Sequence, residues 1–339
     1  MKISNTANVL TQALLENQRL IQAGENPNKM ITPYLTGAPG IGKTSIVEQT
    51  GAEMGLEVQS VIIAQFDPAE LAGLAYLDGD QYNRARPSWM PEDGEGILFL
   101  DELPQACTMS QNLMAQLCNE RKIGEHALGD GWLLVAAGNS TKHKAGTSTM
   151  PTHLRDRLMF LECQANLDDV VEYFNKAGYD ERICGYLRYR PDFLAQFDPS
   201  QDACPSPRSW ARVSTILQWT LSPFEQYESV KGTVGEAAAA DLQGYLELYH
   251  EMPDPDKIIA NPEKGEIPTN PALLYALTSA LAARSKKENI KKIITYLNRL
   301  TNREFAAFTM KDALARNPEF LNNSDVQAWF LKEGKELLR

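Results

Sequence analysis

The feature that most constrains this chain is a glycine-rich segment at residues 37–45, with the sequence G-A-P-G-I-G-K-T-S. It matches the pattern G-x-x-x-x-G-K-[ST] of a phosphate-binding loop. Residues 30–36 before it are strand-like, and residues from 45 onward have helical spacing, so main-chain N–H groups would face an anion at a helix N-terminus. We therefore predict a nucleotide-binding domain. The residues assigned to the loop are Gly37, Ala38, Pro39, Gly40, Ile41, Gly42, Lys43, Thr44 and Ser45.

Two side chains of this loop have distinct expected tasks. The ammonium group of Lys43 would reach the β- and γ-phosphates of ATP as a mobile point charge. The hydroxyl of Thr44 would take a coordination position on Mg²⁺, which prefers oxygen ligands. ATP and Mg²⁺ are therefore the predicted cofactors.

Composition excludes several other classes of protein. The chain has 339 residues, 43% of them apolar, enough for two or three globular domains. A net charge of −11 argues against a general nucleic-acid binder, which needs clustered Lys and Arg. Apolar runs stay short of the 18 residues of a membrane span, and the start lacks the apolar core of a secretory signal. We expect a cytoplasmic protein without a membrane partner, its five scattered cysteines serving as structural thiols.

The chain changes character near residue 163. Before that point helical segments alternate with short apolar strand candidates, which is typical of an α/β domain with a largely parallel sheet. The strand candidates are residues 31–36, 57–63, 96–100, 132–137 and 158–163. After residue 164 helical periodicity dominates, in segments such as 167–177, 207–221, 235–250, 271–284 and 286–300. The second half is therefore predicted to be all-helical.

The sequence I-L-F-L-D-E at residues 97–102 is the second informative motif. Four apolar residues predict a buried strand, and Asp101 at its carboxyl end would face the same crevice as the phosphate loop and hold Mg²⁺. This is the Walker B pattern. Glu102 could polarise a water for attack on the γ-phosphate. The alternative is that both carboxylates only favour the first turn of the following helix.

A third strand candidate ends in Asn139, which could orient the attacking water. On its own an Asn after a strand is more often a turn former. Two arginines, Arg155 and Arg157, flank Asp156 before the last strand candidate, and Arg208 opens a later helix. An arginine finger would neutralise charge on the transferred phosphoryl group, but from spacing alone local ion pairs with Asp156 and Asp168 are the favoured explanation for the first two.

Together, the motifs G-A-P-G-I-G-K-T, L-F-L-D-E-L, V-A-A-G-N, D-R-L-M-F and S-P-R-S-W resemble the MoxR-type branch of the AAA+ ATPases. The resemblance covers about residues 31–213. It implies a five-stranded parallel sheet in the order 5-1-4-3-2, a helical lid, and a ring, usually a homo-hexamer, with ATP sites between subunits. On this basis we expect an AAA+ core at residues 1–165, a lid at 166–250 and a helical C-terminal region at 251–339.

The resemblance also implies roles for individual residues. Lys43 and Thr44 belong to Walker A, Asp101 and Glu102 to Walker B, and Asn139 is sensor 1. Arg157 aligns with the finger that acts in trans, and Arg208 aligns with the sensor 2 arginine of the lid, which touches the γ-phosphate. This sequence departs from the family where Leu158 replaces a Phe and where Arg155 is close enough to share the finger role.

Two hairpin insertions typical of the family fit residues 73–89 and 121–131. In the first, Asp78-Gly79 is a hairpin turn signal. Tyr76, Tyr82 and Trp89 could grip a substrate there, although cross-strand packing is the favoured explanation for aromatic residues in a hairpin.

The expected function is a Mg²⁺-dependent ATPase that remodels a protein partner. Relatives are commonly paired with a protein carrying a von Willebrand factor A domain. One alternative is a nucleic-acid-stimulated motor, a helicase or restriction-type translocase, against which the net charge argues. Another is an ATP-gated scaffold that hydrolyses slowly, against which an intact Glu102 argues. A small-molecule kinase would have no use for the paired sensor residues.

Overall fold

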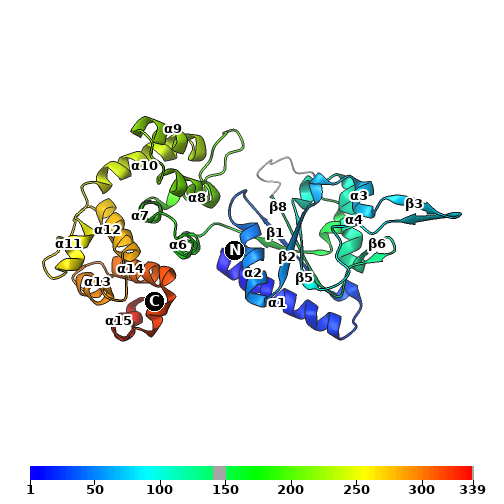
Figure 1. The fold of residues 1–339 in the computed structure, drawn as a ribbon, viewed down its shortest axis with the longest axis horizontal. Coiled ribbons are helices and arrows are strands. Elements are labelled where there is room, and N and C mark those ends of the chain that lie inside the picture. Colours follow the sequence, from blue (N-terminus) through cyan, green and yellow to red (C-terminus); the bar gives the residue numbers. More distant parts are fainter. Residues whose placement is uncertain (140–149, 338–339) are drawn as a thin grey trace. The chain divides into compact units, whose positions relative to one another are not determined.

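The computed structural model describes residues 1–139 and 150–337 (Figure 1). The chain divides into two compact units, residues 1–164 and residues 165–339. The first is an α/β unit, and the regular elements described in the second are all helices.

A five-stranded parallel sheet forms the centre of the α/β unit. Its strands are β1 (Thr32–Gly37), β2 (Glu57–Ile62), β5 (Glu95–Asp101), β8 (Gly131–Asn139) and β9 (Leu158–Glu162). They lie in the order β2-β5-β8-β1-β9. Numbered along the chain and taken from β9, this is the order 5-1-4-3-2, so the predicted AAA+ topology is confirmed. The strand bounds differ from the expected ones by at most two residues. Because all strands are parallel, their carboxyl ends share one edge.

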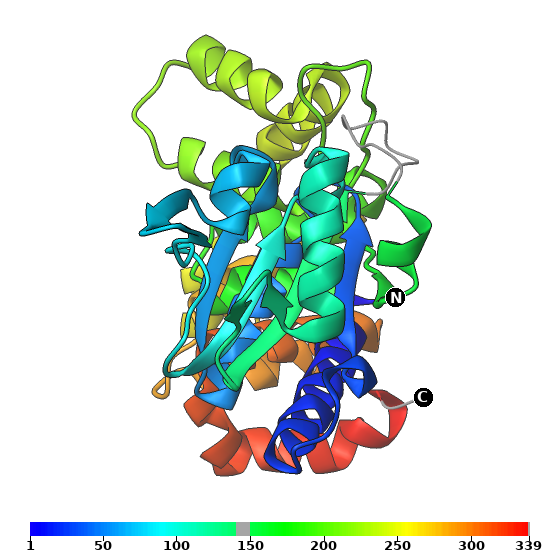
Figure 2. The ribbon, with the colours of Figure 1, turned by 90° about the vertical axis from the view of Figure 1, so that its right-hand side faces the viewer.

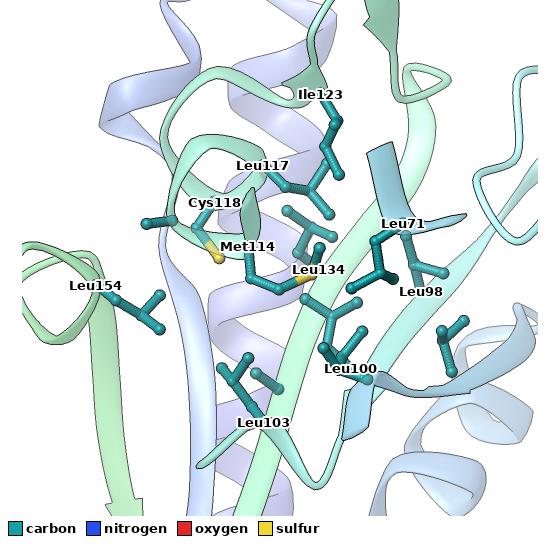
Figure 3. Close-up of a cluster of buried hydrophobic side chains, with 14 of the residues drawn as sticks. Leu71, Leu98, Leu100, Leu103, Met114, Leu117, Cys118, Ile123, Leu134 and Leu154 are labelled. Atoms are coloured by element: carbon teal, nitrogen blue, oxygen red, sulfur yellow. The ribbon is translucent and has the colours of Figure 1, made fainter. Parts of the chain in front are cut away.

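Helices cover both faces of the sheet. Successive side chains of β5 point to opposite faces of the sheet. Leu98 and Leu100 belong to the hydrophobic cluster between the sheet and α4 (Thr108–Glu120), while Ile97 and Phe99 lie on the other face. Figure 3 shows Met114 and Leu117 of α4 packed against Leu98, Leu100 and Leu134. The helix α4 lies in front of the sheet in Figure 2. On the opposite side α1 (Ile3–Gln22) packs against α2 (Lys43–Met54) and the sheet.

The long helix α1 fixes the entry to β1. Its residues Leu10, Leu14 and Asn17 are buried at helical spacing. The Asn17 side chain accepts a hydrogen bond from Ile31 N (2.9 Å) and donates one to Ile31 O (2.6 Å). This paired contact holds the residue just before the strand that leads into the phosphate loop.

Two hairpins extend the α/β unit. The larger, β3 (Ala75–Asp78) with β4 (Gln81–Arg84), projects from the unit in Figure 1, and the smaller pairs β6 (Lys122–Ile123) with β7 (His126–Ala127). Both expected hairpins are present. The turn of the first is shifted by one residue from the expected Asp78-Gly79, because Asp78 pairs with Gln81 and leaves Gly79 and Asp80 as the loop. Gly79 has φ 60°, as the first loop position of a type II′ turn requires.

The helical unit packs around two hydrophobic clusters. Its helices are α6 (Leu167–Lys176), α7 (Glu181–Tyr189), α8 (Pro207–Ile216), α9 (Pro223–Val234), α10 (Glu236–Tyr249), α11 (Pro255–Ala260), α12 (Pro271–Ala283), α13 (Ile290–Leu297), α14 (Arg303–Arg316) and α15 (Ser324–Leu337). A buried ion pair, Arg188 Nη2 to Asp312 Oδ1 at 2.6 Å, joins α7 to α14. The division into a lid and a C-terminal region at residue 250 stays a prediction, and residues 338–339 lie outside the described part.

Within the described parts of the chain, every helix is too short or too polar to cross a membrane.

Candidate nucleotide-binding site

The phosphate loop follows β1 and leads directly into α2, as its sequence predicts. Gly37, Gly40 and Gly42 have φ angles of 156°, 76° and 105°, which side chains rarely adopt. A Cβ on Gly37 would also lie 2.6 Å from the main-chain oxygen of Cys163, so neither the angle nor the space there admits a larger residue. The loop curls tightly enough to present the first N–H groups of α2 toward a bound anion.

The ammonium group of Lys43 lies inside the loop. Its Nζ donates to Gly37 O (3.1 Å), Ala38 O (3.0 Å) and Asn139 Oδ1 (3.0 Å). An ammonium group has three donors, so these three oxygens hold Lys43 in a defined position. The third contact links the phosphate loop to the end of β8, and the predicted sensor residue therefore lies where it can interact with a bound phosphate.

Thr44 and Asp101 come together across the same crevice. The Thr44 hydroxyl lies 3.4 Å from Asp101 Oδ2, although the two residues are 57 positions apart. A hydroxyl and a carboxylate are oxygen ligands of the kind that Mg²⁺ prefers, so this donor set fits the ion. The second oxygen of Asp101, Oδ1, accepts from the main-chain N–H of Glu102 at 2.8 Å. That bond orients the carboxylate with one oxygen toward Thr44.

Glu102 has an unusual backbone. Its φ of 55° and ψ of 30° place it in the left-handed region, which costs a non-glycine residue about 1–2 kcal/mol. It precedes the short helix η3 (Leu103–Gln105) but makes no side-chain capping hydrogen bond. The capping alternative raised from the sequence therefore has no support at this residue. Backbone strain of this kind is typical of functional sites.

Gly138 and Tyr34, for which the sequence predicted no role, pack beside the site. A Cβ on Gly138 would lie 2.2 Å from Pro104 Cδ and 2.6 Å from the Tyr34 hydroxyl, so only glycine fits beside Asn139. Tyr34 is 2% exposed, and burial raises the pKa of its hydroxyl, with the charge of Asp101 adding to the effect. A glycine directly before the strand-end Asn139 was the available signal for this close approach.

Arg155 and Arg157 lie away from the phosphate loop of their own chain. Arg157 precedes β9, whose first residue Leu158 pairs with Thr32 at the start of β1, while the phosphate loop follows the end of β1. Five residues of strand separate the two levels, roughly 16 Å at 3.3 Å per residue. Arg157 is half-buried and its Nη1 donates to His153 O, whereas Arg155 is exposed. Arg208 is exposed in the first turn of α8, in the helical unit.

At the amino end of the sheet Arg157 also lines a cavity of about 360 Å³. Other residues around it are Asn28, Thr32, Cys118, Asn119 and Asp156.

Among the three predicted aromatic contacts of the first hairpin, Tyr76 and Tyr82 are 50% and 66% exposed. Trp89 is 6% exposed and belongs to the core, so it cannot grip a substrate.

Part of this chain is similar to a known protein family. The model of the AAA family, the ATPase family associated with various cellular activities, matches residues 33–160. A search of curated proteins finds no match. Among solved structures, a point mutant of RuvB from Thermotoga maritima has 16% identity and a TM-score of 0.41, covering 82% of this chain and 81% of its own. NtrX from Brucella abortus has 15% identity and a TM-score of 0.38, covering 95% of this chain and 66% of its own.

Proposed function

Proceeding from an AAA ATPase domain at residues 33–160, we propose that this protein is a Mg²⁺-dependent ATPase of the MoxR type that works as a homo-hexamer and remodels a protein partner. One observation carries the catalytic part of the proposal. Lys43 Nζ is 3.0 Å from Asn139, and Thr44 is 3.4 Å from Asp101, so the start of α2 and the ends of two strands supply polar groups to one crevice.

Each of these groups has a task in hydrolysis. Lys43 and the N–H groups of the loop bind the β- and γ-phosphates of ATP, for which Lys43 exchanges its present oxygen partners. Glu102 accepts a proton from the attacking water, and Asn139 orients that water. Thr44 and Asp101 would hold Mg²⁺, which neutralises phosphate charge when bound. Within residues 1–139 and 150–337 the Glu102 carboxylate has no hydrogen-bond partner, which leaves it available for water.

The arginine finger is proposed to come from a neighbouring copy. Arg157 lies at the opposite edge of the sheet from the phosphate loop of its own chain, at a distance of roughly 16 Å along the strand. An arginine side chain is too short to bridge that gap. If Arg157 stabilises the charge on a transferred γ-phosphoryl group, that group belongs to the ATP of another subunit, and this requirement is the physical argument for a ring.

The helical unit is proposed to sense the nucleotide. Arg208 in the first turn of α8 would contact the γ-phosphate as sensor 2, and its loss of that contact after hydrolysis would move the lid at residues 166–250. Ser206 and Ser209 form a capping box around Arg208 and fix the start of the helix. A rigid helix start suits a residue that must report the position of one phosphate group.

The partner is proposed to be a protein, with one carrying a von Willebrand factor A domain as the specific candidate. The exposed side chains of the β3–β4 hairpin offer a contact surface, since Leu77 is 76% and Tyr82 is 66% exposed and the two face each other across the strands. Neighbouring apolar and aromatic side chains of this size are typical of protein contacts.

The test is specific ATPase activity as a function of protein concentration, with Mg²⁺ and without partner. Activity per subunit that rises together with particle mass supports a site completed between copies. Substantial activity in particles with the mass of one subunit would contradict the ring. A parallel series with single-stranded and duplex DNA separates the alternative, because strong stimulation by DNA would contradict a protein-remodelling role.

A further inference from the structure

The segments that lead into β5 and β8 are already joined by hydrogen bonds before the two strands pair. The strands bearing Asp101 and Asn139 are adjacent, and their pairing begins with Glu95 opposite Gly131. Before that point the two incoming segments remain bonded: Trp132 Nε1 donates to Asp93 O at 2.9 Å, and Gly129 N donates to Pro91 O at 3.1 Å. A Cβ on Gly129 would lie 2.2 Å from Glu92 O, so the two backbones are as close as glycine allows.

Further from the sheet, Arg86 joins the same two segments. Its Nη2 donates to Ala127 O in β7 at 2.5 Å and to Pro91 O at 3.2 Å. Its Nε donates to Met90 O at 3.3 Å. A guanidinium carries five donors in a fixed plane, so one side chain holds three carbonyl groups from two segments in a set arrangement.

The outermost contacts join the two hairpins directly. Arg84, the last residue of β4, pairs with Ala75 in β3 and directs both its main-chain polar groups at the smaller hairpin. Its N–H donates to Glu125 Oε1 (3.4 Å), and its C=O accepts from His126 Nε2 (2.9 Å). The turn of the smaller hairpin therefore covers the free edge of β4 at this point.

Each hairpin is also fixed at its own base. In the larger one, Arg84 Nη1 donates to Gly73 O at 3.0 Å, and a Cβ on Gly73 would lie 1.9 Å from Ala85 O. In the smaller one, Arg121 Nη2 donates to Gly129 O (2.8 Å) and Trp132 O (2.7 Å). Neither base can bend without breaking hydrogen bonds of partly or fully buried groups.

We propose that the two hairpins and the strands β5 and β8 form one lever, in which Glu125 and His126 clamp Arg84. The clamp transmits a shift of Asp101 or Asn139, caused by nucleotide at one end of these strands, to residues 75–84 at the other end. This inference rests on the proposed function for its premise that nucleotide binds beside Asp101 and Asn139. It adds the connection through which the site would move the exposed hairpin.

Hydrogen–deuterium exchange of the full chain tests the lever, with ADP and with a non-hydrolysable ATP analogue. The variant Glu125→Ala/His126→Ala removes the clamp outside the nucleotide site. The matched control, Asp80→Ala/Gln81→Ala, changes two exposed side chains at the tip of the same hairpin. Thermal unfolding of all three proteins checks that each remains folded.

We expect nucleotide to protect residues 37–45 in all three proteins. In the wild type and the control, exchange at residues 75–84 should also differ between the two nucleotides by at least about twofold. The clamp variant should lose that difference and keep the protection of residues 37–45. The lever would be overturned if exchange at residues 75–84 of the wild type were the same with both nucleotides. It would also be overturned if the clamp variant kept the wild-type difference in exchange. Absence of protection at residues 37–45 in the wild type would instead contradict nucleotide binding at this site.

Discussion

The two ends of the central sheet each carry one non-glycine residue in the left-handed region, and the surroundings of the two differ. Glu102, with φ 55°, follows β5 at the carboxyl end, and Arg121, with φ 53°, precedes the hairpin that leads into β8 at the amino end. The Arg121 side chain is 7% exposed and donates to Gly129 O and Trp132 O. Glu102 has no side-chain capping bond that would offset its strain.

The two residues differ in whether their own side chains offset the backbone strain. At the amino end two main-chain hydrogen bonds, each worth about 1.5–3 kcal/mol with a charged donor, offset the backbone cost of Arg121. At the carboxyl end the cost at Glu102 has no comparable offset in its own side chain, and the residue lies beside Asp101 in the crevice that holds Lys43 and Asn139. A carboxylate held there at a cost to folding is consistent with selection for hydrolysis rather than for stability.

The largest expected effect comes from the carboxyl end. Lys43→Ala removes the ammonium group that joins Gly37, Ala38 and Asn139, and with it the charge that binds phosphate. We expect nucleotide binding and ATP hydrolysis to fall below detection in calorimetry and phosphate-release assays. Lys29→Ala, which removes an exposed lysine paired with Glu25, is the control and should keep full activity. Normal turnover by the Lys43 variant would show that the crevice is not the ATPase site.

At the amino end, the comparison predicts a catalytic loss without a binding loss. Arg157→Ala should leave the nucleotide affinity of its own crevice unchanged and lower kcat by roughly 10³-fold or more, as arginine fingers do. The matched variant is Arg155→Ala, two residues away and exposed. A larger loss of kcat in the Arg155 variant would transfer the finger role to that residue. Unchanged kcat in both variants would mean that neither arginine acts on ATP.

Replacement of both left-handed residues by Asn sharpens the comparison, since Asn tolerates this conformation. Glu102→Asn should raise the melting temperature of the α/β unit by a few degrees, about 1 kcal/mol, while kcat falls by roughly 10²-fold or more. Arg121→Asn should lower the melting temperature, because it leaves Gly129 O and Trp132 O without their donor. Calorimetry and steady-state kinetics measure both effects. A stabilised Arg121 variant, or a destabilised Glu102 variant, would contradict the contrast.

The smallest expected effect is on the chemical labelling of two thiols, Cys107 directly before α4 and Cys118 within it. Cys107 is exposed, and the Ser110 hydroxyl lowers the pKa of its thiol, whereas burial raises the pKa of Cys118, beside the amino-end cavity, to about 12. Because only the thiolate reacts, iodoacetamide at pH 8 should label Cys107 first and Cys118 only after unfolding. Ser110→Ala should slow the labelling of Cys107. Mass spectrometry of the digested protein measures both, and early labelling of Cys118 would contradict the packing there.

Much of the carboxyl end was predictable from the sequence because its signals are local. Each motif there predicts the element that carries it: the phosphate loop, the apolar run before Asp101 and the strand that ends in Asn139. Because the strands are parallel, their carboxyl ends lie at one edge of the sheet. The shifted turn at Gly79 was not predictable, because the register that pairs Asp78 with Gln81 depends on the whole hairpin. The sequence wrongly made Trp89 a candidate for substrate contact. Its burial depends on core residues distant in sequence, which no local pattern reveals.

For Gly138 the sequence offered one signal, a glycine before Asn139, but not the partners that require it. Its need for glycine comes from Pro104 and Tyr34, which are 34 and 104 residues away and lie on neighbouring segments of the fold. The contacts of Arg84 with Glu125 and His126 likewise join segments more than 40 residues apart. No periodicity or local motif encodes such pairs, so they can be found only from the structure.

The central claim, that the two ends of the sheet complete one another between subunits, is tested most directly by mixing two inactive variants. Lys43→Ala subunits keep Arg157, and Arg157→Ala subunits keep an intact nucleotide crevice. Mixed rings place an intact Arg157 beside an intact crevice at some interfaces, so we predict that ATPase activity reappears and peaks near equal proportions. Activity that never exceeds that of either variant alone, in rings shown by mass to contain both, would contradict the account.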